Sequence, residues 1–195
     1  MDVINILVGI NLFATITANA SGAKKGLKSS ISEVIERPKT YLQKVPLNIA
    51  ALVLILQILG VFQLGTFNID ETNPFYTYRL IGLIIFIVFS WIQVWSYRTL
   101  GGNYSQEVVI TKKQQLVTTG PFKFVRHPQY ISQLLCDFGA GLALSSFIVL
   151  PIVLLVQLPL FILRAQLEEK LLVKRFPDEY ENYKKKTGFI IPFIG

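Results

Sequence analysis

The chain contains 195 residues, of which 52% are hydrophobic and only 16% are charged. Its mean hydropathy of +0.49 excludes an ordinary soluble domain and predicts a membrane protein. The formal net charge of +7 does not require a nucleic-acid partner, because basic loops beside anionic lipid headgroups explain it.

Five apolar stretches are long enough to span or enter a bilayer, and they predict an all-α, multi-pass fold. We expect them at about residues 3–20, 46–67, 80–97, 131–149 and 150–163. The first contains three asparagines, but its start carries Asp2 and no Lys or Arg, so it is a mature span rather than a cleaved signal peptide. The last is short and should form a tight hairpin with the fourth, turning near Ser145 and Ser146 or at Pro151.

All but one of the 19 basic residues fall in three polar segments, which follow the first, third and fifth spans. The first two segments contain Lys24, Lys25, Lys28, Arg37, Lys39 and Lys44, and then Arg98, Lys112, Lys113, Lys123 and Arg126. The exception, Arg79, lies between the second and third spans with Asp70 and Glu71. Because cytoplasmic loops gather Lys and Arg, we expect the N-terminus outside and the C-terminus in the cytoplasm.

One structural domain is expected, with three membrane helices in residues 1–97 and a functional region in residues 98–195. Glycines predict turns at 101–103 and 120–121. Residues 106–110 favour a short strand, and the tail favours helices at about 163–174 and 178–186.

The most informative segment is the polar run 120–130, which contains the only histidine of the chain, His127. A helix that begins near Pro128 would present His127 and Tyr130 about one turn apart at its positive end, where free N–H groups suit a carboxylate. The alternative is a simple helix start, because Pro128 suits a first turn and Arg126 suits lipid phosphates.

A second polar cluster, with Arg164, Glu168 and Glu169, follows the last apolar stretch. Arg164 and Glu168 either form an intrahelical ion pair or face a cavity, since an ionisable group at this depth is costly. In a cavity, Arg164 would offer its fork to an anion and Glu168 would accept hydrogen bonds. Asp137 lies within a span with no partner identifiable from sequence, and the single cysteine, Cys136, excludes intrachain disulfides.

Short motifs follow one another in a characteristic order between residues 98 and 195. They are Leu100-Gly-Gly-Asn-Tyr104, Gln115-Leu-Val117, Thr119-Gly-Pro-Phe122, Val125-Arg-His-Pro-Gln-Tyr130, Glu168-Glu169, Phe176-Pro-Asp-Glu-Tyr180, Tyr183, Thr187-Gly and Pro192. This region resembles the isoprenylcysteine carboxyl methyltransferases and the related phospholipid methyltransferases of membranes. The sequence departs from that pattern at Gln114, often histidine, at Phe122, often tyrosine, and at Ser132 and Pro177, both often glycine.

The resemblance implies a helical membrane enzyme that uses S-adenosylmethionine, and the chain has no glycine-rich fingerprint of a Rossmann-type fold. It places the cofactor at the cytoplasmic face, held by Gln114, Gln115, Leu116, Val117, Phe122, His127, Pro128, Gln129, Tyr130 and Glu168. It assigns catalysis to Arg164 and Glu168, with Arg164 binding the substrate carboxylate. Methyl transfer to an ionised carboxylate needs no general base and no metal, and a lone histidine provides no metal-ligand cluster.

We therefore expect S-adenosylmethionine-dependent methyl transfer to a lipophilic acceptor, with the carboxylate of an isoprenylcysteine-like thioether as the leading substrate. An amine or thiol acceptor would need His127 or Glu168 as a base. Two alternatives stay open: an NADPH-dependent membrane reductase of the sterol-reductase type, whose C-terminal pattern is similar, and a non-enzymatic membrane scaffold. The small size predicts a prokaryotic cell membrane, and we expect acceptors to arrive laterally from the bilayer between the fourth and fifth spans and their neighbours.

Overall fold

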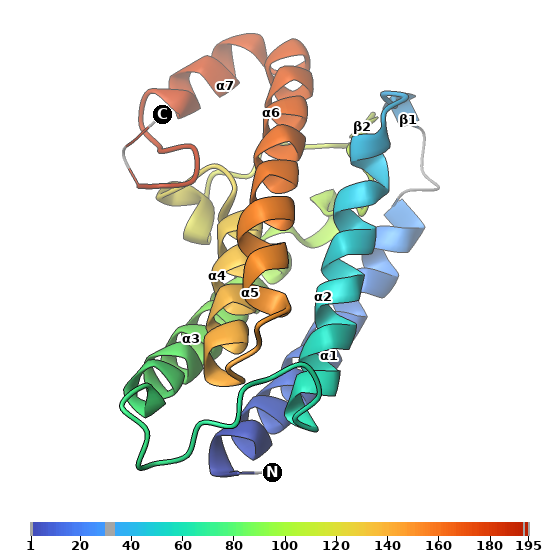
Figure 1. The fold of residues 1–195 in the computed structure, drawn as a ribbon. Coiled ribbons are helices and arrows are strands. Elements are labelled where there is room, and N and C mark those ends of the chain that lie inside the picture. The colour runs from blue at the N-terminus through green and yellow to red at the C-terminus, as the bar shows by residue number, and fades with distance from the viewer. Residues whose placement is uncertain (1, 30–33, 193, 195) are drawn as a thin grey trace.

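The computed structural model describes residues 2–29, 34–192 and 194, and it is built almost wholly of helices (Figure 1). The long helices are α1 (Val3–Ser29), α2 (Val45–Val61), α3 (Tyr76–Leu100), α4 (Pro128–Ala143) and α6 (Leu158–Arg175). The short α5 (Val149–Ile152) leads through a π-helical turn (Val153–Gln157) into α6, and α7 (Pro177–Lys184) follows.

The long helices run side by side and give the molecule two ends (Figure 1). The hairpin end carries the N-terminus, the α2–α3 loop and the α4–α5 turn. The tail end carries α7, the C-terminal segment and a two-stranded sheet, in which β1 (Val34–Glu36) pairs antiparallel with β2 (Ile110–Thr111). Short 3₁₀ helices at Tyr41–Gln43, Gly101–Asn103 and Gly120–Lys123 complete the connections.

Glycines let α3 and α4 touch through their backbones. A Cβ atom on Gly82 would lie 2.5 Å from Leu142 Cβ and 2.6 Å from Ala143 N, and one on Gly139 would lie 2.6 Å from Phe86 N. Such close approach of small residues is the usual means of packing helices in membranes, where no hydrophobic effect drives them together. The contact fixes where α4 begins relative to the end of α3.

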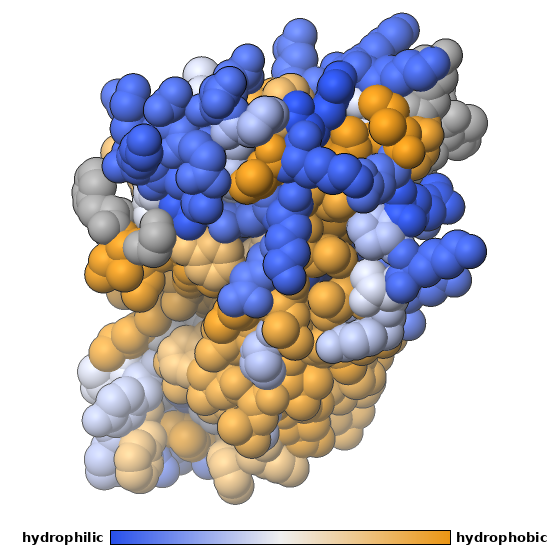
Figure 2. Space-filling model, turned by 90° about the horizontal axis from the view of Figure 1, so that it is seen from above, coloured by the Kyte–Doolittle hydropathy of each residue, from blue (hydrophilic) through white to orange (hydrophobic). Residues whose placement is uncertain are grey.

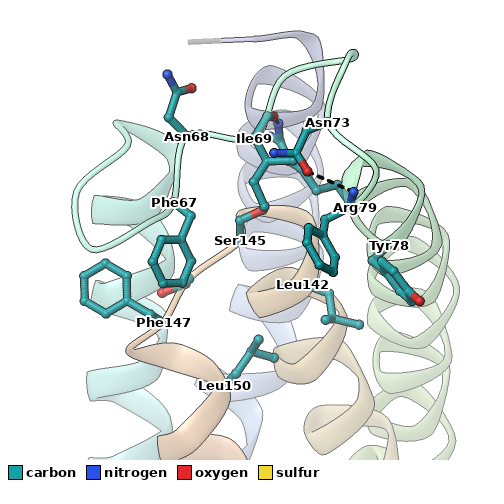
Figure 3. Close-up of a pocket in the computed structure, with 12 residues that line it drawn as sticks. Phe67, Asn68, Ile69, Asn73, Tyr78, Arg79, Leu142, Ser145, Phe147 and Leu150 are labelled. Atoms are coloured by element: carbon teal, nitrogen blue, oxygen red, sulfur yellow. Dashed lines mark hydrogen bonds between the residues drawn. The ribbon is translucent and has the colours of Figure 1, made fainter.

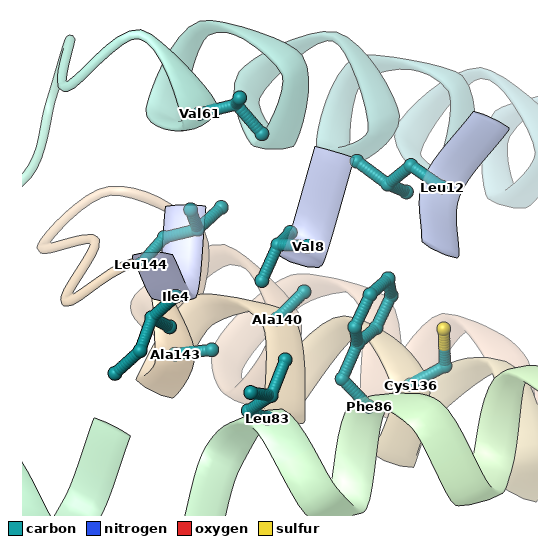
Figure 4. Packing of buried hydrophobic residues seen from close by; sticks show 10 residues of the cluster. All are labelled: Ile4, Val8, Leu12, Val61, Leu83, Phe86, Cys136, Ala140, Ala143 and Leu144. Atoms are coloured by element: carbon teal, nitrogen blue, oxygen red, sulfur yellow. The ribbon is translucent and has the colours of Figure 1, made fainter. Parts of the chain in front are cut away.

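A hydrophobic cluster from α1, α2, α3, α4 and the residue that follows α4 fills the space between these helices (Figure 4). Its members are Ile4, Val8, Leu12, Val61, Leu83, Phe86, Cys136, Ala140, Ala143 and Leu144. Cys136 therefore packs as a small apolar residue, and it is a free thiol.

The bundle leaves many large apolar side chains on its surface, among them Phe13, Ile55, Ile84 and Leu155. Figure 2, which views the molecule from above, shows hydrophilic side chains gathered in one region beside a broad hydrophobic surface. Within the described residues, three helices are long and apolar enough to cross a membrane: Tyr41–Val61, Tyr76–Asn103 and Val149–Arg175. Val3–Asn19 forms a shorter apolar helix.

Two of the asparagines of the first stretch are helix contacts. Asn5 Nδ2 donates to Val61 O at 3.1 Å, and Asn11 Nδ2 donates to Ser90 Oγ at 2.9 Å. The helix runs on to Ser29, and the side chains of Lys24, Lys25 and Lys28 lie outside the described residues.

Several predicted boundaries were wrong. α4 ends at Ala143 rather than near residue 149, and the fifth span is continuous with the predicted helix at 163–174. The turn does lie at Ser145, whose φ is 53°, whereas Pro151 lies inside α5. The strand predicted at 106–110 is reduced to β2, because a single short partner, β1, is available for pairing.

Candidate active site

The polar run 120–130 folds against the tail-end terminus of α3. Gly120 has a φ of 59°, and a Cβ there would lie 2.9 Å from Thr99 Oγ1, so only glycine fits this turn. The turn buries Phe122, whose carbonyl accepts a hydrogen bond from the hydroxyl of Tyr183 at 2.5 Å. This hydrogen bond joins Phe122 of the polar run to Tyr183 of the C-terminal tail.

The C-terminal segment lies alongside the run and holds its backbone. Arg126 N donates to Gly188 O at 2.8 Å, and His127 N donates to Phe189 O at 3.3 Å. The Arg126 side chain is buried rather than directed at lipid phosphates, and its Nε donates to Glu169 Oε1 at 2.6 Å. Arg126 Nη1 also donates to Thr187 O at 2.6 Å, so this guanidinium ties α6 and the tail to the run.

His127 is 2% exposed and sits directly before α4, with Pro128 in the first turn. Its Nε2 lies 3.3 Å from Glu169 Oε1. Its ring stacks on Tyr130, with centroids 5.6 Å apart and planes 19° apart. The two rings are therefore neighbours at the helix start, as the sequence predicted.

Arg164 and Glu168 do not pair within α6. Instead the hydroxyl of Tyr130 lies between them: it donates to Glu168 Oε2 at 3.0 Å and accepts from Arg164 Nε at 3.1 Å. The ion-pair alternative was thus wrong, because a third residue from α4 separates the two charges.

Arg164 is 3% exposed, and several elements hold its guanidinium. Nη1 donates to Leu42 O at 2.8 Å and to Gln43 O at 3.0 Å, and Nη2 donates to Gln106 O. With the Tyr130 contact, four of the five N–H donors of an arginine are engaged. Within the part of the chain that the structure describes, one N–H of Arg164 thus remains without a hydrogen-bond partner, on a guanidinium whose position is fixed by three segments.

A crevice at the tail end gathers residues from both polar clusters. Its volume is about 60 Å³. It is lined by Leu100, Asn103, Tyr104, Ser105, Gln114, Gln115, Leu116, Val117, Phe122, Arg126, His127, Gln129, Glu168, Leu172, Tyr180 and Tyr183. Eight of the predicted cofactor residues are among them, whereas Pro128, Tyr130 and Arg164 are not.

Three features of the crevice suit a nucleoside with an attached amino acid. Phe122, Tyr180 and Tyr183 supply aromatic surface, Glu168 supplies a carboxylate, and Gln129 carries a buried Oε1 with no hydrogen-bond partner in the described residues. Such a ligand needs on the order of 300 Å³. The lining segments therefore have to separate to admit it.

Burial raises the pKa of the phenols at this end above the ordinary value of a tyrosine. It raises the pKa of Tyr180, with the carboxylates of Glu169 and Glu168 adding to the shift, and it raises the pKa of Tyr183 and of Tyr104. These groups act as hydrogen-bonding aromatic walls and carry no charge at neutral pH.

A second cavity, of about 410 Å³, lies between α1, α2, α3 and α4. Most of its wall is apolar, and Tyr104 lines both this cavity and the crevice. Tyr104 packs edge-on against Tyr97, with ring centroids 4.8 Å apart. One tyrosine therefore stands between a polar crevice and an apolar chamber in the bundle.

A wider cavity of about 710 Å³ opens at the hairpin end (Figure 3). Aromatic and aliphatic side chains line it, including Phe67, Tyr78 and Phe147. Its one cation, Arg79, is occupied by Asp2, Asn5 and two carbonyls. Among the residues described around this cavity, the one cation is therefore already engaged.

A model of the phospholipid methyltransferase family matches residues 77–179, which is more than half of the chain. The chain belongs to the phospholipid methyltransferase family. The match covers α3, the polar run, α4, α6 and the start of α7, and so includes both polar clusters.

Curated proteins similar to this chain include the protein-S-isoprenylcysteine O-methyltransferases of Saccharomyces cerevisiae and Schizosaccharomyces pombe. They are each 34% identical, over 59% and 48% of this chain and over 49% and 41% of their own lengths. The chain thus spans about half the length of the curated relatives it matches.

A solved structure of a eukaryotic intramembrane Ras methyltransferase, isoprenylcysteine carboxyl methyltransferase, superimposes with a TM-score of 0.65. The match covers 96% of this chain and 64% of that one, at 21% identity, and so establishes the fold. This family protein is an integral membrane protein with the helical architecture that the sequence predicted.

Sequence reasoning missed Arg126, Glu169 and the two tail tyrosines as parts of the site. All four lie in motifs that the sequence displays. What the motifs could not reveal is that Arg126 turns inward to Glu169, because that contact spans 43 residues.

Proposed function

We propose that this protein transfers a methyl group from S-adenosylmethionine to a lipophilic acceptor, and that the acceptor group is the carboxylate of an isoprenylcysteine-like thioether. The single observation that carries the proposal is the convergence of Gln114–Val117, Phe122, His127, Gln129 and Glu168 on one crevice. The names of the curated relatives support it, and nothing in the comparisons favours a reductase or a scaffold.

When bound, S-adenosylmethionine supplies a methyl group on a positively charged sulfur. Gln129 and Glu168 would hold its polar groups, and Phe122 would cover its base. Glu168 has the charge to accept hydrogen bonds from an ammonium group or from hydroxyl groups. These contacts fix the donor in one orientation, which in-line transfer requires.

Arg164 would bind the acceptor carboxylate and align it. Its guanidinium is fixed by Tyr130 and by carbonyls of two other segments, so one remaining N–H can orient an oxygen without further ordering. Arg164 lies outside the crevice wall, on the far side of the Tyr130 hydroxyl from Glu168. The acceptor held by Arg164 and the donor held by Glu168 would then meet beside the Tyr130 hydroxyl, which keeps the two side chains in fixed positions.

The hydrophobic part of the acceptor would occupy the 410 Å³ cavity, which reaches the crevice at Tyr104. The cavity is lined by α1 to α4, so the acceptor would enter between the fourth span, α4, and its neighbours among these helices. We further propose that the tail end faces the cytoplasm, as the basic segments predict. The prokaryotic membrane stays a prediction, and the relatives named above are eukaryotic.

The test measures S-adenosylhomocysteine binding and methyl transfer to an S-prenylated N-acetylcysteine. We expect Glu168→Gln and Gln129→Ala to weaken binding at least tenfold, which corresponds to loss of one charged or buried hydrogen bond. Gln166→Ala, on an exposed position of the same helix, should bind as the wild type does. Equal binding by all variants, or binding of NADPH in place of S-adenosylhomocysteine, would contradict the proposal.

A further inference from the structure

Asp137 is an intramembrane carboxylate that the proposed reaction does not use. It lies in the middle of α4 and is 3% exposed. Three glutamine side chains donate to it, each at 2.7 Å: Gln57 to Oδ1, and Gln133 and Gln157 to Oδ2. Gln93 in turn donates to Gln133 Oε1. These five residues are called the Asp137 cluster.

The partners of Asp137 are neutral amides. Among the residues that the structure describes, no ion pair involves this carboxylate. A negative charge within the bilayer is costly without a cation or a full set of hydrogen-bond donors. A carboxylate offers about four acceptor sites, and the three glutamines fill three of them. Asp137 can therefore accept one more hydrogen bond.

A second observation points the same way. Gln157 Oε1 is fully buried and has no hydrogen-bond partner among the described residues. Gln157 belongs to the π-helical turn, a distortion that often occurs at functional sites. A carboxylate and an orphaned amide oxygen therefore lie together on one hydrogen-bonded cluster, and both are acceptors.

The cluster opens onto the apolar cavity. Gln57, Gln93, Gln133 and Asp137 all line the 410 Å³ space, which otherwise is mainly apolar. Asp137 follows Gln129 of the crevice by eight residues along α4, a rise of about 12 Å. The polar patch is thus set well back along α4 from Gln129 of the crevice.

We propose that the Asp137 cluster binds a hydrogen-bond donor, a hydroxyl or an ammonium group, carried on the hydrophobic chain of the acceptor about 12 Å from its reacting group. This assignment rests on the proposed function for the identity of the ligand. It means that the protein selects a functionalised lipid chain over a plain hydrocarbon, because a hydrocarbon has no donor for the acceptor site of Asp137 that the three glutamines leave free.

The experiment uses three S-alkylated N-acetylcysteines of equal chain length: one plain, one with a hydroxyl group and one with an amine about 12 Å from the carboxylate. Calorimetry measures the Kd of each probe for the wild-type protein in detergent. We expect a donor-bearing probe to bind about tenfold more tightly than the hydrocarbon. The hydroxyl and amine arms decide which donor is preferred, and equal Kd values for all three overturn the proposal.

Variants separate recognition from packing. Asp137→Asn should reduce the tenfold preference to about twofold, whereas Asp70→Asn, which removes an exposed carboxylate at the hairpin end, should retain it. Leu54→Trp, which fills the cavity, should weaken all three probes, and Ile55→Trp, on an exposed position of the same helix, should not. An Asp137→Asn protein that binds every probe like the wild type would mean that the cluster only joins helices.

The outcome is independent of turnover. If no probe is methylated and S-adenosylhomocysteine does not bind, the proposed function fails. The Kd comparison among the probes still decides whether the cluster recognises a donor. Methylation of all three probes with equal kcat/KM would overturn the selectivity while leaving the proposed function intact.

Discussion

The bond between Arg126 and Glu169 should contribute measurably to stability. Arg126 Nε lies 2.6 Å from Glu169 Oε1, and the two side chains are only 3% and 16% exposed. Removing one partner of a fully buried pair costs about 3–5 kcal/mol. Because Glu169 keeps some access to solvent, we expect Glu169→Ala to cost about 3 kcal/mol and Arg126→Ala about 2 kcal/mol.

The two losses should not add. Both variants break the same bond, so the double variant should cost about 3 kcal/mol in total, a coupling energy of about 2 kcal/mol. For a chain of this size, 3 kcal/mol corresponds to a fall in Tm of about 6–12 °C. Thermal unfolding in detergent, followed by circular dichroism, measures it.

Glu181→Ala is the matched control, because Glu181 makes only a surface pair with Lys184 at 3.2 Å. Its Tm should change by less than about 2 °C. Additive losses in the double variant, or a Glu169→Ala protein as stable as the control, would refute the argument that this pair holds α6 against the run.

Three further predictions concern packing, the site and pH. Gly82→Ala should lower Tm by several degrees, because its Cβ would meet the α4 backbone, whereas Gly102→Ala, with nothing within 4 Å, should not; equal Tm values would contradict the close α3–α4 contact. Tyr130→Phe removes the hydroxyl that bridges the guanidinium and the carboxylate, so kcat should fall about tenfold with S-adenosylhomocysteine binding within twofold; an unchanged kcat would exclude a positioning role. Burial opposes ionisation of Asp2, but bonds from Arg79 hold its pKa below the usual 3.8, so this stabilisation is present above that pH and is lost as pH falls through the lowered pKa. Arg79→Gln should therefore show a smaller loss of Tm on acidification than the wild type, and a parallel loss would count against the pair.

Hydropathy predicted the fold well because each membrane helix must satisfy its own backbone and cover itself with apolar side chains. The tight turn at Ser145 and the helix start at Pro128 also followed from local chemistry. The continuity of the last span did not, because Pro151 and Pro159 are usual helix breakers. Here Pro151 lies in α5, Pro159 lies in the first turn of α6, and a π-helical turn joins the two helices.

The candidate site was only partly predictable. The motif residues that line the crevice were found because the order and spacing of their motifs resemble those of a known family. The partners of Asp137 could not be found, since Gln57 and Gln157 lie 80 and 20 residues away and glutamines carry no distinctive pattern. The contact of Arg164 with Gln43 could not be predicted either, because 121 residues separate them in the sequence.

The measurement that tests the central claim most directly is calorimetric titration of the detergent-solubilised protein with S-adenosylhomocysteine, with NADPH as the comparison ligand. Glu168→Gln and Gln166→Ala serve as the site variant and its control. The account predicts a Kd in the micromolar range for the wild type and for Gln166→Ala, binding at least tenfold weaker in Glu168→Gln, and no heat from NADPH. Binding of NADPH alone, or a Kd for S-adenosylhomocysteine that Glu168→Gln leaves unchanged, would contradict the assignment of the crevice as the methyl-donor site.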